Sequence, residues 1–179
     1  MKLMIISDTH GFYEPTKKAF EIFEKNKSDY MIILGDIVYH GPRNDINEYY
    51  EPKKIVDFLN KYANKIIAIK GNCDAEIDSM ILNFPLVENS IIFIGNRKIF
   101  LTHGHVYNEH NMPLLNERDI LIRGHFHIPL LLSQDGVYVA SPGSIGVPKA
   151  NSKPSYIIID DYGLKIYTLD GEKIEELDF

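Results

Sequence analysis

The stretch KLMIISD (residues 2–8) decides the fold class, because it is a short apolar run that ends abruptly in polar residues. A run of this kind is typical of a buried strand. The runs at residues 30–36 and 65–72 follow the same plan, and the segments between them, 14–27 and 52–65, carry apolar residues at helical spacing. This alternation of strand and helix predicts right-handed crossovers and a parallel sheet.

The second half of the chain is rich in strands. A short helix is expected within residues 74–84. Residues 90–104 and 129–141 each predict a hairpin, and residues 120–127 predict one extended strand between them. Residues 155–177 contribute three more strands. We therefore expect an α/β (α+β) protein in which two sheets are flanked by helices.

Length and composition predict one domain that spans residues 1–179. The net charge of −6 argues against binding of a nucleic-acid polymer, because proteins that follow a phosphate backbone carry an excess of Lys and Arg. A single cysteine, Cys73, excludes an internal disulfide. The apolar run before Asp8 is shorter than the core of a signal peptide, and no stretch approaches the length of a membrane span. We expect a cytoplasmic protein without membrane association.

Residue types that bind metals gather where the predicted strands end. Ligands of open α/β sheets collect at the carboxyl ends of the strands. The candidates are Asp8, His10, Asp36, Asn72, His103, His125 and His127. Each motif alone is common in turns. Together, imidazole, carboxylate and amide oxygen suit Mn, Fe, Co, Ni or Zn, and seven ligands exceed the need of one ion. Two ions about 3.5–4 Å apart that share one carboxylate fit this set.

The segment GHFH (residues 124–127) raises a narrower expectation. If it is extended, side chains alternate between the two faces of the strand. His125 and His127 then point the same way, and Phe126 points into a core.

The ordered motifs DTH, GD, GNCD, THGH and GHFH resemble those of the calcineurin-like metallophosphoesterases, and most closely the compact YfcE-type phosphodiesterase branch. The resemblance covers essentially the whole chain. It implies a four-layer αββα sandwich, in which two mixed sheets are flanked by helices. It also implies three ligand roles: Asp8, His10 and His127 hold one metal, Asn72, His103 and His125 hold the other, and Asp36 bridges both.

The resemblance leads us to expect a phosphodiesterase in which a hydroxide bridging two divalent metal ions attacks phosphorus of a small phosphoester in line. Mn²⁺ is the expected ion, with Ni²⁺, Co²⁺, Zn²⁺ and Fe²⁺ as alternatives. A phosphomonoesterase or cyclic-nucleotide esterase with the same centre stays open. So does a non-catalytic, retromer-like scaffold, although unused buried ligands would then carry a desolvation cost. A homodimer and a homotetramer are both compatible with the sequence.

Several residues near the expected centre have open roles. Most of the superfamily has histidine where this chain has Cys73, which therefore either faces the substrate or fills a small apolar space. Cys73, Asp74 and His105 are counted with Asp36 and Asn72 as catalytic candidates, and His105 either touches phosphate or supports a ligand. Arg43, within the long loop before residue 52, either binds phosphate oxygens or is solvated.

Overall fold

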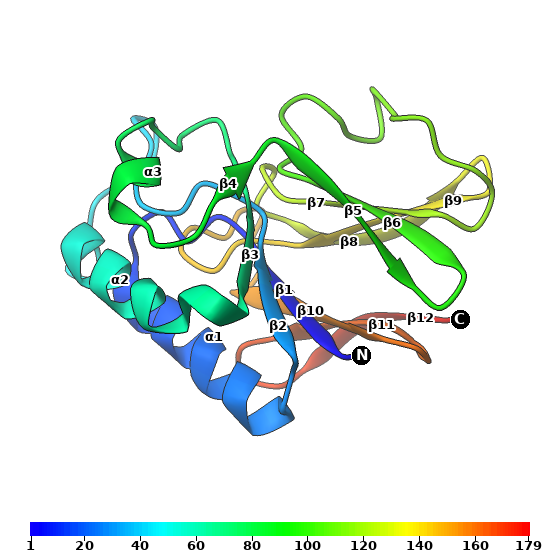
Figure 1. Cartoon of the computed structure of the whole chain (residues 1–179), viewed down its shortest axis with the longest axis horizontal. Helices are drawn as coiled ribbons and strands as arrows, with labels where there is room; N and C mark the ends of the chain where they lie inside the picture. The colour runs from blue at the N-terminus through cyan, green and yellow to red at the C-terminus, as the bar shows by residue number, and fades with distance from the viewer.

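The computed structural model describes residues 1–179 and contains two mixed β-sheets that pack face to face (Figure 1). The strands of the larger sheet are β1 (Leu3–Ile6), β2 (Tyr30–Ile33), β3 (Ile66–Ile69), β4 (Leu86–Val87), β10 (Ser155–Asp160), β11 (Gly163–Thr168) and β12 (Lys173–Asp178). Their order is β12-β11-β10-β1-β2-β3-β4. Strands β1 to β4 run parallel, as the alternating pattern predicted, whereas β10 to β12 are antiparallel to their neighbours.

The smaller sheet is built from the second half of the chain. Its strands are β5 (Asn89–Ile94), β6 (Arg97–Thr102), β7 (Ile120–Arg123), β8 (Pro129–Gln134) and β9 (Val137–Pro142). The order is β5-β6-β7-β9-β8. The three central strands are parallel, and the two edge strands close the predicted hairpins in antiparallel register.

The two longer helices lie on the outer face of the larger sheet, and a short third helix lies near β4, apart from them (Figure 1). The helices are α1 (Tyr13–Asn26), α2 (Pro52–Leu59) with its 3-10 continuation η1 (Asn60–Lys65), and the single-turn α3 (Asp78–Ile81). The two longer helices match the predicted segments, and α3 is shorter than the segment expected to contain it. None of these helices combines the length and the apolar character that crossing a bilayer requires.

A loop takes the place of helices on the outer face of the smaller sheet. The two-sheet sandwich is confirmed, but residues 103–119 cross that face without forming a helix (Figure 1). The ring of Tyr107 packs against Phe100 of β6 at a centroid distance of 5.5 Å. Pro113 and the turn-forming side chain of Asn108, which accepts the backbone N–H of His110 at 2.9 Å, disfavour a helix here.

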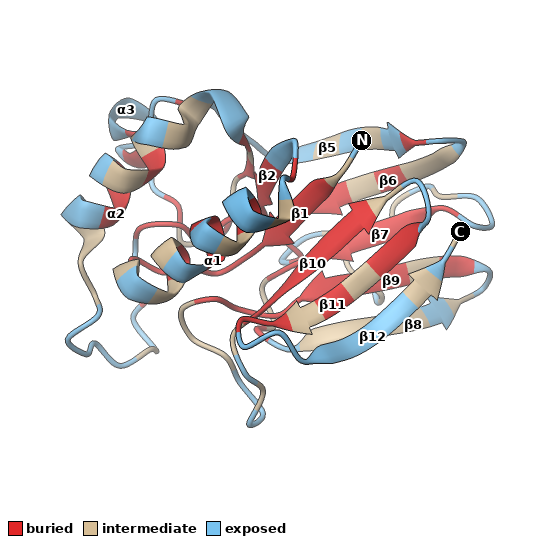
Figure 2. Cartoon of the chain, turned by 90° about the horizontal axis from the view of Figure 1, so that it is seen from below, coloured by how far each residue is buried: buried red, intermediate tan, exposed pale blue.

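Apolar side chains form two layers of core, because successive residues of a strand face opposite sides of its sheet. Met4 and Ile6 of β1 pack toward α1 and α2, whereas Leu3 and Ile5 pack between the two sheets. Figure 2 shows β1 and β10 buried over most of their length, while β12 at the edge is largely exposed. The strand ends that carry the polar motifs are therefore anchored by well-packed strands.

Candidate metal centre

The predicted ligands come together at one end of the two sheets. They lie in the loops that directly follow β1, β2, β3, β6 and β7. Because neighbouring parallel strands end at the same edge, these loops meet there. The structure brings together all seven predicted ligands, which are Asp8, His10, Asp36, Asn72, His103, His125 and His127.

A left-handed backbone holds most of these side chains in place. Asp8, His10, Asp36, His125 and His127 all have φ between 47° and 69°. Positive φ is uncommon for residues other than glycine and costs about 1–3 kcal/mol each, so it persists only where the surroundings enforce it. The chain thus turns sharply after β1, β2 and β7 and directs these polar side chains back over the sheet end.

The expectation of an extended GHFH segment is wrong. Strand β7 ends at Arg123, and both following histidines have positive φ, so the alternation of faces does not apply. His125 and His127 instead belong to different ligand clusters. Phe126 does not enter the core either, because its half-buried ring lies under the guanidinium of Arg123, 4.3 Å from the ring centroid. Backbone turns, rather than strand pleating, separate the two imidazoles.

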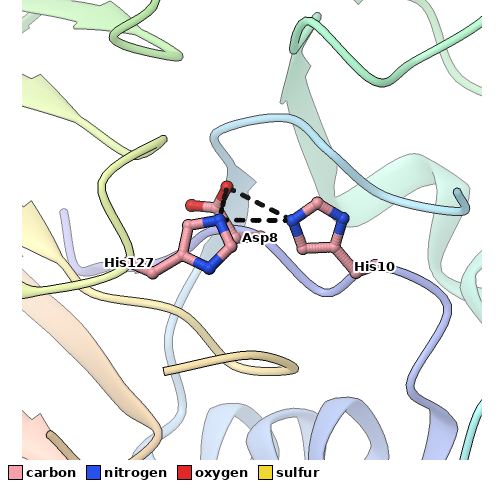
Figure 3. Close-up of side chains that lie close together, drawn as sticks. All are labelled: Asp8, His10 and His127. Carbon is pink, nitrogen blue, oxygen red and sulfur yellow. Dashed lines mark hydrogen bonds and ion pairs between the residues drawn. The ribbon is translucent and has the colours of Figure 1, made fainter. Parts of the chain in front are cut away.

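Asp8, His10 and His127 form the first cluster (Figure 3). The Oδ1 atom of Asp8 lies 3.2 Å from Nε2 of His127 and 3.8 Å from Nε2 of His10. The two Nε2 atoms are 3.3 Å apart. All three side chains are almost fully buried. Three ligand atoms therefore converge on one point, as three neighbouring ligands of a metal ion would.

Asp36, His103 and His125 form the second cluster, with Asn72 beside it. Oδ2 of Asp36 lies 3.3 Å from Nε2 of His103. The same nitrogen lies 3.3 Å from Nδ1 of His125 and 3.1 Å from Oδ1 of Asn72. Two imidazoles, a carboxylate and an amide oxygen again meet around one point.

Backbone carbonyls fix the orientation of three of the imidazoles. Each of these rings donates its Nδ1–H to a carbonyl oxygen and so turns its Nε2 atom toward the cluster. The pairs are His10 with Tyr39 at 2.7 Å, His103 with Leu34 at 2.6 Å and His127 with Val147 at 2.6 Å. This arrangement is typical of histidines that bind metals through Nε2.

The ligand atoms of the first cluster fit a divalent cation, because hydrogen-bond acceptors face one another there without a hydrogen-bond donor between them. Oδ1 of Asp8 is buried and has no hydrogen-bond partner. The Nε2 atoms of His10 and His127 approach to 3.3 Å although the Nδ1 atom of each ring already donates elsewhere. A buried acceptor without a partner costs free energy, and a bound cation removes that cost.

The pKa values of the second cluster also indicate that its buried carboxylates favour a positive charge nearby. Burial lowers the pKa of His103, but its hydrogen bond to Asp36 and the charges of Asp36 and Asp8 raise it further, to about 9. Burial and the neighbouring charge on His103 lower the pKa of His125 to about 4. One proton on His103 therefore compensates the two carboxylates, and a bound metal would replace that proton.

Asp36 lies between the two clusters. Its Oδ2 atom is 3.7 Å from Nε2 of His10 and 3.3 Å from Nε2 of His103. Its Oδ1 atom accepts the backbone N–H of Cys73 at 2.8 Å. A β-carbon at Gly71 would collide with this carboxylate, so glycine there permits the close approach. The position of Asp36 allows one carboxylate to contact ions in both clusters.

The sequence pattern of the calcineurin-like phosphoesterase superfamily domain matches residues 1–161. The chain belongs to this superfamily. The resemblance drawn from the five motifs is thereby confirmed, together with the expectation that the chain is an enzyme acting on phosphoesters.

Individual superfamily members agree in sequence and in fold. The chain is 38% identical over 175 residues to phosphodiesterase YfcE of Escherichia coli (strain K12). The alignment covers 97% of this chain and 95% of the relative. The solved structure of E. coli YfcE matches with a TM-score of 0.96 over 99% of each chain. Vps29 of Entamoeba histolytica, solved in complex with zinc, is 24% identical with a TM-score of 0.62 over 99% of each chain, a likeness of fold alone.

Asp74 supports the centre of this phosphoesterase through hydrogen bonds to the backbone, and it also belongs to the lining of the adjacent cavity. Its buried carboxylate accepts backbone N–H groups from Asp36 at 2.9 Å, Ile37 at 2.7 Å and Gly71 at 2.7 Å. Burial raises the pKa of Asp74, whereas these three hydrogen bonds favour its charged form. Both oxygens are occupied by the backbone, so Asp74 is placed to position Asp36.

Cys73 and Arg43 line a cavity of about 670 Å³ in front of the two clusters, together with His10, Asp36 and Asn72. Burial and the nearby charge of Asp36 raise the pKa of the Cys73 thiol to about 12, so it is neutral at physiological pH. The half-buried side chain faces the cavity, which does not match the interpretation of Cys73 as a buried filler.

His105 lies outside the lining of this cavity. Its ring centroid is 5.4 Å from that of His103 and 6.2 Å from that of His125, and its side chain is exposed. Sequence reasoning did not single out several residues that line the cavity, among them Tyr39 and Lys149. Exposed tyrosines and lysines are ordinary surface residues, so neither residue stands out by its type.

Proposed function

We propose that this phosphoesterase hydrolyses a small phosphodiester at a centre of two divalent cations. The observation that carries the proposal is the position of Asp36, whose Oδ2 atom lies between a cluster with His10 and a cluster with His103. Separate ligand sets on either side of one carboxylate support two ions rather than one. Asp8, His10 and His127 would hold the first ion, and Asn72, His103 and His125 the second.

The residues of the chain supply binding and orientation. Two such ions, when bound, would supply Lewis acidity, which would lower the pKa of a bound water molecule and offset negative charge on the phosphoryl oxygens. Asp36 contributes negative charge and fixed geometry to both sites, and Asp74 holds its backbone in place. Arg43 lies at the cavity surface, where its guanidinium can pair with an anionic group of the substrate.

A diester is the favoured substrate over a monoester, since the 38% identical relative YfcE is a phosphodiesterase. Cys73 occupies the cavity where most of the superfamily has histidine. A neutral thiol is a weak hydrogen-bond donor, so Cys73 would assist the leaving group little. His105 would act from outside the cavity, as a support for His103 rather than as a substrate ligand.

The proposed ion is Mn²⁺, because the two sites offer four imidazoles together with carboxylate and amide oxygens. Mg²⁺ prefers an all-oxygen shell and would bind more weakly. The proposed setting is the cytoplasm, with a small phosphoester as the only ligand besides the ions.

The test is turnover of bis(p-nitrophenyl) phosphate by protein loaded with Mn²⁺, with p-nitrophenyl phosphate as the paired monoester. We expect about two metal ions per chain by elemental analysis and a higher kcat/KM for the diester. A higher kcat/KM for the monoester would make the protein a phosphomonoesterase. Absence of turnover with both esters, at full metal content, would favour a non-catalytic, retromer-like scaffold.

A further inference from the structure

Lys149 ends a segment that is fastened to the first ligand cluster. The hydroxyl of Ser144 donates to the carbonyl oxygen of Asp8 at 2.8 Å, and His127 donates its Nδ1–H to the carbonyl of Val147. The backbone N–H of Lys149 in turn donates to the carbonyl oxygen of His127 at 3.2 Å. The backbone of Lys149 is therefore fixed to a predicted metal ligand, and its side chain lines the cavity.

The chain turns back directly after Lys149. Ala150 and Asn151 both have positive φ, 53° and 58°. Asparagine tolerates this conformation, but alanine adopts it only at a cost in free energy. The hydroxyl of Ser152 closes the turn by donating to the carbonyl oxygen of Lys149 at 2.6 Å. A strained turn thus holds Lys149 at the edge of the cavity instead of letting the chain continue over it.

Lys149 and Arg43 are the two Lys or Arg side chains that line the cavity. Both are exposed, and no carboxylate lies within 4.0 Å of either charged group. The cavity, at about 670 Å³, has the size that encloses a whole small molecule rather than one phosphate group. Metal ions held by the ligand clusters would bind the phosphate that is cleaved. The side chains of Lys149 and Arg43 would then be available for another part of the substrate.

We infer that Lys149 is a specificity residue that binds a second anionic group of the substrate, a carboxylate or a further phosphate, with Arg43 as the other cation of this subsite. The inference rests on the proposed phosphodiesterase function. It adds that the substrate is a phosphodiester that carries a second negatively charged group, separate from the phosphate that is cleaved.

Two diesters with the same leaving group test this subsite. One is p-nitrophenyl phenyl phosphate, and the other carries a carboxylate on the para position of the phenyl ring. The wild-type protein, loaded with Mn²⁺, should bind the carboxylated diester with a KM about tenfold lower, the value of one charge-assisted hydrogen bond. Lys149→Met should move the ratio of the two KM values toward one, with Arg43 accounting for any difference that remains, and Lys149→Arg should preserve the ratio.

Lys153→Met is the matched control, because Lys153 is exposed, pairs with Glu172 at 2.7 Å and does not line the cavity. It should leave the KM ratio at the wild-type value, and elemental analysis should give equal metal content for all variants. A KM ratio that is the same in the wild type and in Lys149→Met would overturn the subsite while leaving the phosphodiesterase proposal in place. Absence of turnover of both diesters by the metal-loaded wild type would overturn both.

Discussion

The carboxylate of Asp74 accepts the backbone N–H of Asp36 at 2.9 Å, and so fixes the residue that lies between the two ligand clusters. It binds the N–H groups of Ile37 and Gly71 as well, which joins the loops after β2 and β3. Asp74 touches none of the imidazoles, yet the position of the shared carboxylate depends on it.

Asp74→Asn should therefore weaken metal binding. The amide retains one acceptor oxygen and loses the charge that holds three N–H groups, so we expect the Mn²⁺ affinity to fall about 10–100-fold. Isothermal titration with Mn²⁺ measures this, with the exposed Asp57→Asn as control. Unchanged affinity at both sites would show that Asp74 does not position Asp36.

Asp36→Asn should lower activity more than Asn72→Ala. Asp36 lies next to both clusters, whereas Asn72 contacts only the one with His103. Loss of kcat/KM for Asp36→Asn should exceed the roughly 100-fold that removal of a supporting residue costs. Elemental analysis should give a lower content of both ions for Asp36→Asn and of one ion for Asn72→Ala. Two ions and near-normal turnover in Asp36→Asn would contradict the bridging role.

Removal of metal should abolish activity, and re-addition should restore it selectively. We expect Mn²⁺, Co²⁺ and Ni²⁺ to restore turnover of an aryl phosphodiester, and Mg²⁺ to restore less, because four imidazoles suit the transition metals better. Chelated protein, verified as metal-free by elemental analysis, is assayed with each ion in turn. Full activity of the metal-free protein would refute the proposed centre.

Cys73→His should help poor leaving groups most. The thiol faces the cavity with a pKa raised to about 12, so it protonates a departing alkoxide poorly. General acid catalysis contributes typically about 10²–10⁴-fold, and an imidazole not shaped for this cavity should give less. Rates for substituted phenyl phosphodiesters are plotted against leaving-group pKa for wild type, Cys73→Ala and Cys73→His. Equal slopes at equal metal content would show that this position does not contact the leaving group.

Glu109→Gln should destabilise the fold in a pH-dependent manner. The carboxylate of Glu109 forms two hydrogen bonds with the buried guanidinium of Arg123, at 2.6 and 3.0 Å. Burial raises the pKa of Glu109, but the hydrogen bonds to Arg123 outweigh it, so the pKa lies below its ordinary value. The stability from this pair is present above the unfolded-state pKa and is lost as the pH falls through the folded-state pKa.

At pH 7 the loss of unfolding free energy should be about 2 kcal/mol, because the arginine stays buried without its counter-charge. The difference between wild type and Glu109→Gln should shrink below about pH 4. Urea unfolding at several pH values measures it, with the exposed Glu176→Gln as control. A difference that does not change with pH would mean that the ion pair contributes nothing.

Much of the fold could be predicted from the sequence, because apolar runs and helical spacing report burial directly. The parallel arrangement of β1, β2 and β3 follows from their alternation with helices. The exact ends of strands do not, since a strand stops where the backbone turns, as at Arg123, and no apolar pattern marks that point. The loop over the smaller sheet was also missed, although Pro113 argues against a helix there.

The convergence of the candidate ligands could be predicted because the chemistry of the residue types and their place after strands both point to one shared site. The supporting contacts could not be predicted. Ser144 meets Asp8 across 136 residues of sequence, and Lys149 meets the carbonyl of His127 through a turn with two left-handed residues. Contacts of this kind depend on how distant loops meet, and no local pattern encodes them.

The left-handed backbone at five ligands also decides how their contribution should be measured. An alanine at position 10 or 127 would remove the imidazole and would also be forced into a conformation that alanine resists. The measured loss would then combine absent coordination with a distorted loop. Asparagine accepts positive φ far more readily, so a scan with asparagine instead of alanine would report the loss of coordination with little contribution from the main chain.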